Sequence, residues 1–125
     1  MSRELDAAIA EARGYEVEIM DMIDGSEDYV MTGQGLFLQK VPHYSTDGNA
    51  MLELYQISLN SGWCVQISAI EDTISVSMFA YSGELPEGND EKFLVALIGE
   101  AKGTKLPDTF ARAFYQGKTG KEWQG

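Results

Sequence analysis

Cysteine and histidine each occur only once in this chain of 125 residues, as Cys64 and His43. A single cysteine excludes an internal disulfide, and one cysteine with one histidine cannot form the usual zinc site. Cys64 has apolar neighbours in a strand-like segment, so we expect a small buried hydrophobic residue rather than a nucleophile activated by His43. The glycine patterns of phosphate-binding and dinucleotide-binding loops are also missing. The sequence therefore predicts a protein that is not an enzyme, with no metal and no cofactor.

Long apolar runs are missing as well. No segment approaches the roughly 20 apolar residues that cross a bilayer, so no membrane partner is expected. Residues 1–6 are charged rather than apolar, which is not the pattern of a secretory signal. The single cysteine suits a reducing compartment, and the sequence therefore predicts a cytoplasmic protein.

Basic residues are scarce, since nine stand against 20 acidic residues, for a formal net charge of −11. They are also unevenly distributed: residues 1–91 contain 17 acids and three bases, whereas residues 92–125 contain three acids and six bases. An acidic surface repels nucleic acid and attracts basic proteins, so direct nucleic-acid binding is not expected. Two interpretations of the acidity stay open, a docking surface and simple solubility. The basic end either forms a local anion site or pairs with the acidic part of the chain.

The first 40 residues predict one helix and a small antiparallel unit. Apolar residues at helical spacing predict a helix over residues 2–13. Alternation over residues 15–19 predicts a strand, and residues 21–28 indicate an acidic, turn-rich link. Two short apolar segments, 29–31 and 36–38, flank a glycine-containing turn and predict a hairpin.

Two further helices have recognisable ends. Ser45 is a suitable N-cap for the second helix, with Asp47 in the first turn, and the segment 60–62 ends it. Pro107 opens the last helix, and Gly117 is expected to end it.

The region between these two helices predicts a three-stranded meander. Residues 63–69 and 74–81 alternate between apolar and polar side chains, and the apolar run 93–98 is assigned to a third strand rather than to a helix. The fold class is therefore α+β, with an antiparallel sheet (the meander plus the N-terminal strand and hairpin) layered with about three short helices. We expect one domain over residues 1–117 and a short tail over 118–125.

One segment supports a family resemblance. Pro42–Asp47 reads Pro-His-Tyr-Ser-Thr-Asp and enters a helix, a meander follows, and Leu106 and Pro107 precede a short last helix. These features resemble the phage ABA-sandwich domain family of small bacteriophage and prophage proteins. The resemblance implies a phage origin, the cytoplasm of a bacterial host, an α/β/α layered fold and no catalytic machinery. In size and order of elements the chain is also similar, more weakly, to phage anti-defence proteins that sequester nucleotide-derived immune signals.

The similarity to these sequestering proteins implies a ligand site. An aromatic side chain, from Phe79 or Tyr81, is expected to stack on a base, while arginine and helix N-terminal amides hold phosphates. The residues alone leave alternatives open, because capping explains Ser45 and a solvated arginine explains Arg112. The candidate ligand-binding residues are Tyr44, Ser45, Thr46, Phe79, Tyr81, Lys105 and Arg112.

The sequence thus predicts a non-enzymatic phage-encoded accessory protein, with an anti-defence role, that binds and sequesters a nucleotide-derived signalling molecule. The alternative is an acidic inhibitor that binds a basic surface of a host or defence protein by mimicking the charge of nucleic acid. A contiguous acidic face within residues 4–28 favours this alternative, whereas scattered acids favour solubility alone. An edge strand of the small hairpin, or an exposed apolar helix face, also predicts a homo-oligomer.

Overall fold

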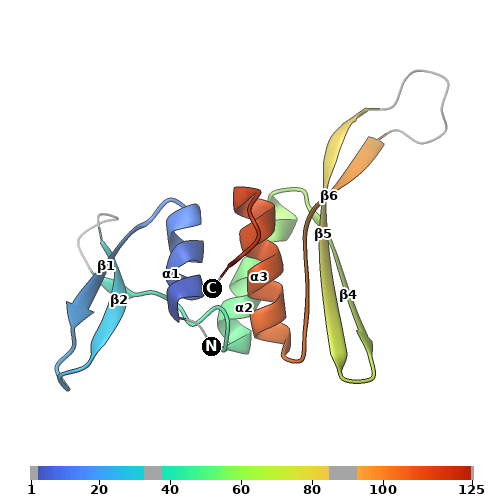
Figure 1. The fold of residues 1–125 in the computed structure, drawn as a ribbon. Coiled ribbons are helices and arrows are strands. Elements are labelled where there is room, and N and C mark those ends of the chain that lie inside the picture. The colour runs from blue at the N-terminus through green and yellow to red at the C-terminus, as the bar shows by residue number, and fades with distance from the viewer. Residues whose placement is uncertain (1–2, 33–37, 85–92, 125) are drawn as a thin grey trace.

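The computed structural model describes residues 3–32, 38–84 and 93–124, and over these segments three helices lie between two three-stranded antiparallel sheets (Figure 1). Side chains are described for these residues except 81–84 and 93–95. The predicted α+β class is confirmed. The helices are α1 (Arg3–Ala12), α2 (Gly48–Asn60) and α3 (Leu106–Thr119); sheet A contains β1 (Glu16–Asp21), β2 (Glu27–Thr32) and β3 (Gln39–Lys40); sheet B contains β4 (Cys64–Ile70), β5 (Thr73–Glu84) and β6 (Phe93–Gly103).

The order of the layers differs from the α/β/α sandwich that the family resemblance implies. Helix α1 packs on sheet A, α3 packs on sheet B, and α3 also contacts α1 and α2. Each small sheet has one apolar face, and helices placed between the sheets bury both faces in one core. Met31 of β2 and Met78 of β5 accordingly belong to the same buried cluster, together with Phe110 and Phe114 of α3.

Sheet A begins with a tighter hairpin than the sequence predicts. Strands β1 and β2 pair from Glu16 opposite Thr32 as far as Asp21 opposite Glu27. The turn is closed by the Met22 amide, which donates to a carbonyl oxygen at 2.7 Å, and Gly25 supplies the φ of +90° within it. The predicted link over 21–28 was therefore too long, because its first residue belongs to β1 and its last two belong to β2.

The second predicted hairpin is confirmed only in part. Strand β2 does pair with a following strand, through Val30 opposite Lys40 and Met31 opposite Gln39. The predicted partner segment 36–38 therefore ends before the observed strand begins, and its residues 36 and 37, like the rest of the turn, lie outside the described residues.

Helix α2 begins two residues later than predicted, because its N-cap is not Ser45. The N-cap is Asp47, whose carboxylate accepts a hydrogen bond from the Asn49 amide at 3.0 Å. Ser45 is buried, and its amide donates to a carboxylate oxygen of Asp6 at 2.8 Å. The assignment of Ser45 as the N-cap was therefore wrong, because a buried carboxylate of α1 holds this amide outside the helix.

Sheet B is the predicted meander, and residues 93–98 are confirmed as part of its third strand. Helix α3 lies so close to β6 that a β-carbon on Gly99 would overlap the carbonyl oxygen of Ala113, and one on Gly103 would crowd Thr109. Cys64 is exposed, because the alternation of β4 places it on the face of the sheet away from the helices. The prediction of a buried cysteine was wrong.

Helix α3 also continues past the position predicted to end it. Gly117 lies inside the helix, where the absence of a side chain admits the ring of Trp63. The helix ends at Gly120, which has a φ of +77° and donates its amide to the Gln116 carbonyl at 2.7 Å. The rings of Trp123 and Tyr115 meet edge-on with centroids 5.2 Å apart, so the described part of the tail folds back on the helix.

The close approach of α3 to β6 gives a stability prediction. Replacing Gly99→Ala forces the helix and the strand apart, and we expect a loss of about 2–3 kcal/mol in the free energy of unfolding. Urea denaturation followed by circular dichroism measures it. The matched control is Gly48→Ala in the first turn of α2, where a β-carbon meets nothing within 4 Å. A Gly99→Ala variant as stable as this control would contradict the packing described.

Candidate functional site

The turn before α2 does not offer the anion site expected from its sequence. The amides of Tyr44, Ser45 and Thr46 all donate to oxygen atoms within the chain, at 2.8–3.2 Å. The Tyr44 ring is completely buried, and its hydroxyl accepts a hydrogen bond from Arg13 at 2.6 Å. Burial raises the pKa of Tyr44, so the phenol stays neutral. The three residues of this turn therefore stabilise the fold.

The two candidate stacking residues lie on β5, apart from that turn. Phe79 is half-buried and stands between Cys64 and Leu97 on the face of sheet B that α3 leaves uncovered. Tyr81 pairs with Val95 further along the strand, and its side chain lies outside the described residues. The structure therefore does not bring Phe79 together with the turn at 44–46.

The two candidate cations occupy different surroundings. Lys105 is the exposed N-cap residue of α3 and makes no side-chain capping bond. Arg112 forms an ion pair with Asp108 at 3.0 Å and donates to the carbonyl oxygen of Lys102 at 2.9 Å. Its guanidinium is thus engaged in holding the edge of β6, although one side of it lines a pocket.

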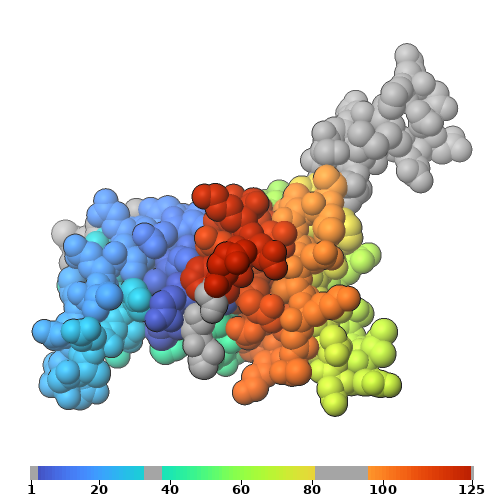
Figure 2. All heavy atoms as spheres, viewed as in Figure 1, coloured from blue at the N-terminus to red at the C-terminus, as the bar shows by residue number. Residues whose placement is uncertain are grey.

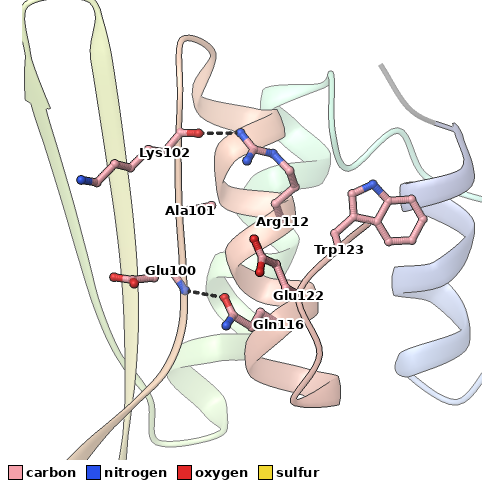
Figure 3. Close-up of a pocket in the computed structure, with 7 residues that line it drawn as sticks. All are labelled: Glu100, Ala101, Lys102, Arg112, Gln116, Glu122 and Trp123. Atoms are coloured by element: carbon pink, nitrogen blue, oxygen red, sulfur yellow. Dashed lines mark hydrogen bonds between the residues drawn. The ribbon is translucent and has the colours of Figure 1, made fainter. Parts of the chain in front are cut away.

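That pocket lies between the edge of β6 and the C-terminal tail and has a volume of about 290 Å³. Figure 3 shows Arg112 and Gln116 reaching from α3 towards β6, where Gln116 accepts a hydrogen bond from the Glu100 amide at 3.0 Å. The side chains of Glu100 and Lys102 point away from the pocket. Its lining residues are Glu100, Ala101, Lys102, Arg112, Gln116, Glu122 and Trp123.

The positive and negative charges that line the pocket are balanced, so the pocket is not cationic. Glu122 lines the same pocket as Arg112, whose own charge is already offset by Asp108. Trp123 supplies one aromatic ring at the end away from β6. The pocket can therefore hold a planar group by stacking, but it contributes little net attraction for an anion.

The other candidate site is a group of exposed acids on the N-terminal elements, which we call the acidic surface. All seven of its carboxylates are exposed, and they lie on α1, on the neighbouring β1–β2 hairpin and in the turn of that hairpin. Figure 2 shows this hairpin forming one end of the molecule. The acidic surface consists of Glu4, Glu11, Glu16, Glu18, Asp21, Asp24 and Glu27. Alternation along β1 places Glu16 and Glu18 on one face of sheet A and Asp21, with its partner Glu27, on the other.

Few positive charges oppose these carboxylates. Within the described part of residues 1–91 the bases are Arg3, Arg13 and Lys40. Arg3 forms ion pairs with Asp6 at 2.9 Å and Asp28 at 3.0 Å. Arg13 forms an ion pair with Glu53 at 2.9 Å. Both arginines bond to acids outside the acidic surface, and Lys40 interacts electrostatically with Asp24. The seven carboxylates therefore keep a net negative potential.

The turn of the β1–β2 hairpin concentrates this charge. Asp21 lies directly opposite Glu27, and Asp24 stands between them in the turn. Two hydrogen bonds from Ser26 lower the pKa of Asp24, which keeps this carboxylate ionised. Ile23 is completely exposed in the same turn. The end of the hairpin therefore combines one exposed apolar side chain with three carboxylates.

Arg3 attaches this hairpin to the rest of the molecule. Besides its ion pairs with Asp6 and Asp28, its guanidinium donates to the carbonyl oxygens of Val41 and Pro42 at 2.8 and 3.2 Å. Asp6 is almost completely buried, so these bonds compensate a carboxylate that has lost its water. One side chain thus joins α1, β2 and the segment that leads into α2.

Comparisons with protein-family models, with curated proteins and with solved structures found no match to this chain. The phage resemblance therefore stays a prediction. In the segments that the structure describes, no three His, Cys, Asp or Glu side chains gather as metal ligands. None of the helices described there combines the length and the apolar character needed to cross a bilayer.

The sequence did not reveal the role of Asp6. Reasoning from charge counted it with the surface acids, but the structure buries it beside Leu5 on the inner face of α1. The available signal was the spacing of Arg3 and Asp6, three residues apart in a helix, which allows an ion pair. No local pattern indicated the third partner, Asp28, which is distant in the sequence.

The Arg3–Asp28 contact gives a prediction with a defined pH dependence. Burial alone would raise the pKa of Asp28, but hydrogen bonds from the Tyr29 amide and Arg3 more than offset this, so its pKa is lowered. The ionised form therefore stabilises the fold above the unfolded-state pKa of about 3.9, and this contribution disappears as the pH falls through the lower folded-state pKa. We expect Asp28→Asn to cost about 1–2 kcal/mol at pH 7 and little near pH 2.

Urea denaturation at several pH values measures this difference. Glu27→Gln is the matched control on the same strand; it removes a like-charge contact with Asp21 and should not destabilise the protein. If Asp28→Asn cost the same at acidic and neutral pH, the charge of Asp28 would not be the stabilising feature.

Proposed function

We propose that the protein is a non-enzymatic binding protein whose acidic surface docks on a basic surface of another protein. The observation that carries this proposal is the end of the β1–β2 hairpin, which combines the exposed Ile23 with the carboxylates of Asp21, Asp24 and Glu27. The carboxylates attract and orient a basic partner, and the isoleucine supplies apolar contact once the surfaces meet.

The arrangement at this turn does not help the protein to fold. Like charges directly opposite each other on paired strands destabilise a hairpin, as Asp21 and Glu27 do here. A fully exposed isoleucine contributes no buried area to the free monomer. If the acidic residues served only solubility, this would explain the net charge of the chain. It would not explain why the exposed Ile23 lies among acidic residues.

The family resemblance gives this proposal a biological setting. In that setting the protein is a phage-encoded accessory protein with an anti-defence role in the bacterial cytoplasm. Its partner is a host or defence protein whose basic surface normally binds nucleic acid, and the acidic surface occupies that surface by charge mimicry.

A matched pair of charge variants tests the proposal. A basic protein captured from bacterial lysate on the immobilised chain, and then purified, serves as the probe. We expect Asp21→Asn with Glu27→Gln to weaken binding about tenfold, since two exposed carboxylates contribute about 1.4 kcal/mol together. The control, Glu100→Gln with Glu122→Gln, changes the net charge equally at another place on the surface and should leave the affinity nearly unchanged. Titration calorimetry at 50 and 300 mM salt measures both.

Equal losses in the two variants would mean that only total charge matters and would contradict a docking site at the hairpin. Affinity that does not fall with added salt would contradict the electrostatic mechanism. Ile23→Ser probes the apolar part of the site separately, and we expect it to weaken binding at both salt concentrations.

A second candidate function, the capture of a nucleotide-type ligand, is favoured by one observation. Arg112 and Trp123 line the same pocket, and an aromatic ring with a guanidinium is a common means of holding a base and a phosphate. The Trp123 ring replaces Phe79 and Tyr81 as the stacking residue in this version of the hypothesis.

Ligand retention tests this second candidate. The protein is incubated with cyclic nucleotides and cyclic ADP-ribose isomers, and after removal of free ligand and heat denaturation the absorbance at 260 nm of the released material is measured. We expect Trp123→Ala to lose the retained ligand and Phe79→Leu, on the opposite face of sheet B, to keep it. No released ligand, or equal release from both variants, would rule this function out.

A further inference from the structure

The contacts of sheet B with α3 show which residue pairs of β5 and β6 are hydrogen-bonded to each other and which are not. The Glu100 amide donates to Gln116, and the Lys102 carbonyl accepts from Arg112, so these backbone groups point away from β5. Pairs in an antiparallel ladder alternate between hydrogen-bonded and non-hydrogen-bonded. Glu100 and Lys102 therefore form the non-bonded pairs with Ser77 and Ser75.

The same alternation fixes the free edge of the sheet. Since Ser75 and Ser77 turn away from β6, they bond to β4, where their partners are Ser68 and Gln66. The intervening residues of β4 then direct their amide and carbonyl groups away from β5. Because β4 is the last strand in the order β4-β5-β6, no described strand pairs with these groups. They belong to Val65, Ile67 and Ala69.

The other three sheet edges are protected against pairing with a further strand. The edge of β6 is occupied by Arg112 and Gln116. Strand β1 carries exposed acidic side chains, and β3 is only two residues long and ends in Lys40. Charges and short length are the usual means of blocking an edge. Strand β4 has neither protection. It is seven residues long, and Cys64–Ile70 contains no charged residue and no proline.

Helix α2 and strand β4 carry almost no charge in a chain of net charge −11, and the exposed acids Glu71 and Asp72 lie beyond the end of β4, in the turn to β5. Over residues 48–70 the only charged side chain is Glu53, which forms an ion pair with Arg13. Any contact between two copies through the acidic surface brings like charges together, whereas a contact through β4 does not. This charge distribution favours pairing of the free edge of β4 with a second copy of the chain.

Helix α2 adds apolar surface next to this edge. Glu53 lies on the side of α2 that faces Arg13. The opposite side of the helix carries Leu52, Tyr55 and Leu59. The side chains of Leu52 and Leu59 are 55% and 43% exposed. This helix contacts β4, whose Ile67 is itself 47% exposed on the same inner side of the sheet. The edge is therefore bordered by aliphatic side chains that the monomer leaves half uncovered.

We propose that two copies of the chain form a two-fold symmetric dimer by antiparallel pairing of β4 with the partner's β4, centred on Ile67. In this register Val65 lies opposite the partner's Ala69, and the outward amides and carbonyls of Val65, Ile67 and Ala69 bond in both directions. The two copies of sheet B become one sheet of six strands. The proposal does not depend on the proposed function.

The mass of the protein in solution tests the dimer. Sedimentation velocity under reducing conditions should give twice 13.8 kDa for the unmodified chain. Ile67→Lys introduces a charge at the centre of the interface, and we expect it to give 13.8 kDa. The control is Leu97→Lys, at a side chain that is also half-exposed but lies on β6; it should remain a dimer. A monomeric unmodified chain, or a dimer that survives Ile67→Lys, would overturn the proposal.

A second measurement tests the register without relying on a destabilising change. Pairing centred on Ile67 places Cys64 opposite the partner's Ile70, on the same face of the sheet. Ile70→Cys should therefore give a covalent dimer under mild oxidation, seen on a non-reducing gel. The two thiols within one chain are about 20 Å apart along the strand and cannot join each other. Ala69→Cys, whose thiol points to the other face, is the control. Equal cross-linking of both variants, or none of Ile70→Cys, would exclude this register.

Discussion

The contact between α3 and β6 is the constraint on which the rest of the structure depends. Gly99 and Gly103 have no side chains, so the backbone of the helix rests directly on the strand. This places Phe110 and Phe114 in the core, where α1 and α2 pack against the same helix. It also brings Arg112 and Gln116 within hydrogen-bond distance of the strand edge. One close approach thus organises the core and closes one side of sheet B.

The distribution of charge follows from how the basic residues are used. The arginines of the N-terminal part are used internally, Arg3 by Asp6 and Asp28 and Arg13 by Glu53. The exposed carboxylates beside them therefore have few positive charges near them, whereas the segment 48–70 carries almost no charge. Exposed acids thus lie on α1 and the β1–β2 hairpin, whereas the uncharged strand β4 lies at the other end of the molecule from this hairpin (Figure 1).

Sequence periodicity predicted those features that depend on neighbours along the chain. The α+β class, the meander and the strand at 93–98 all follow from alternation or apolar runs within a few residues. Features that depend on distant partners were missed. Ser45 was taken as an N-cap because the buried Asp6 that binds its amide lies on another helix. Cys64 was expected to be buried because its apolar neighbours are visible in the sequence, but the uncovered face of sheet B is not.

The environments of the candidate site residues also depend on distant partners that the sequence does not reveal. Arg112 was expected either to be solvated or to hold a phosphate, but its carbonyl partner on β6 depends on how closely the helix approaches the strand. Tyr44 looked available because it precedes a helix, and the structure encloses it completely.

The two proposed surfaces are compatible because they lie at opposite ends of the molecule. In Figure 1 the β1–β2 hairpin lies at one end, α1, α2 and α3 lie in the middle, and β4 forms the other end. A dimer built through β4 therefore leaves both acidic hairpins exposed. Two such hairpins on one particle increase the effective concentration of the second binding event when a partner carries two basic surfaces. Self-association through the neutral end thus strengthens binding through the acidic end without any additional contact.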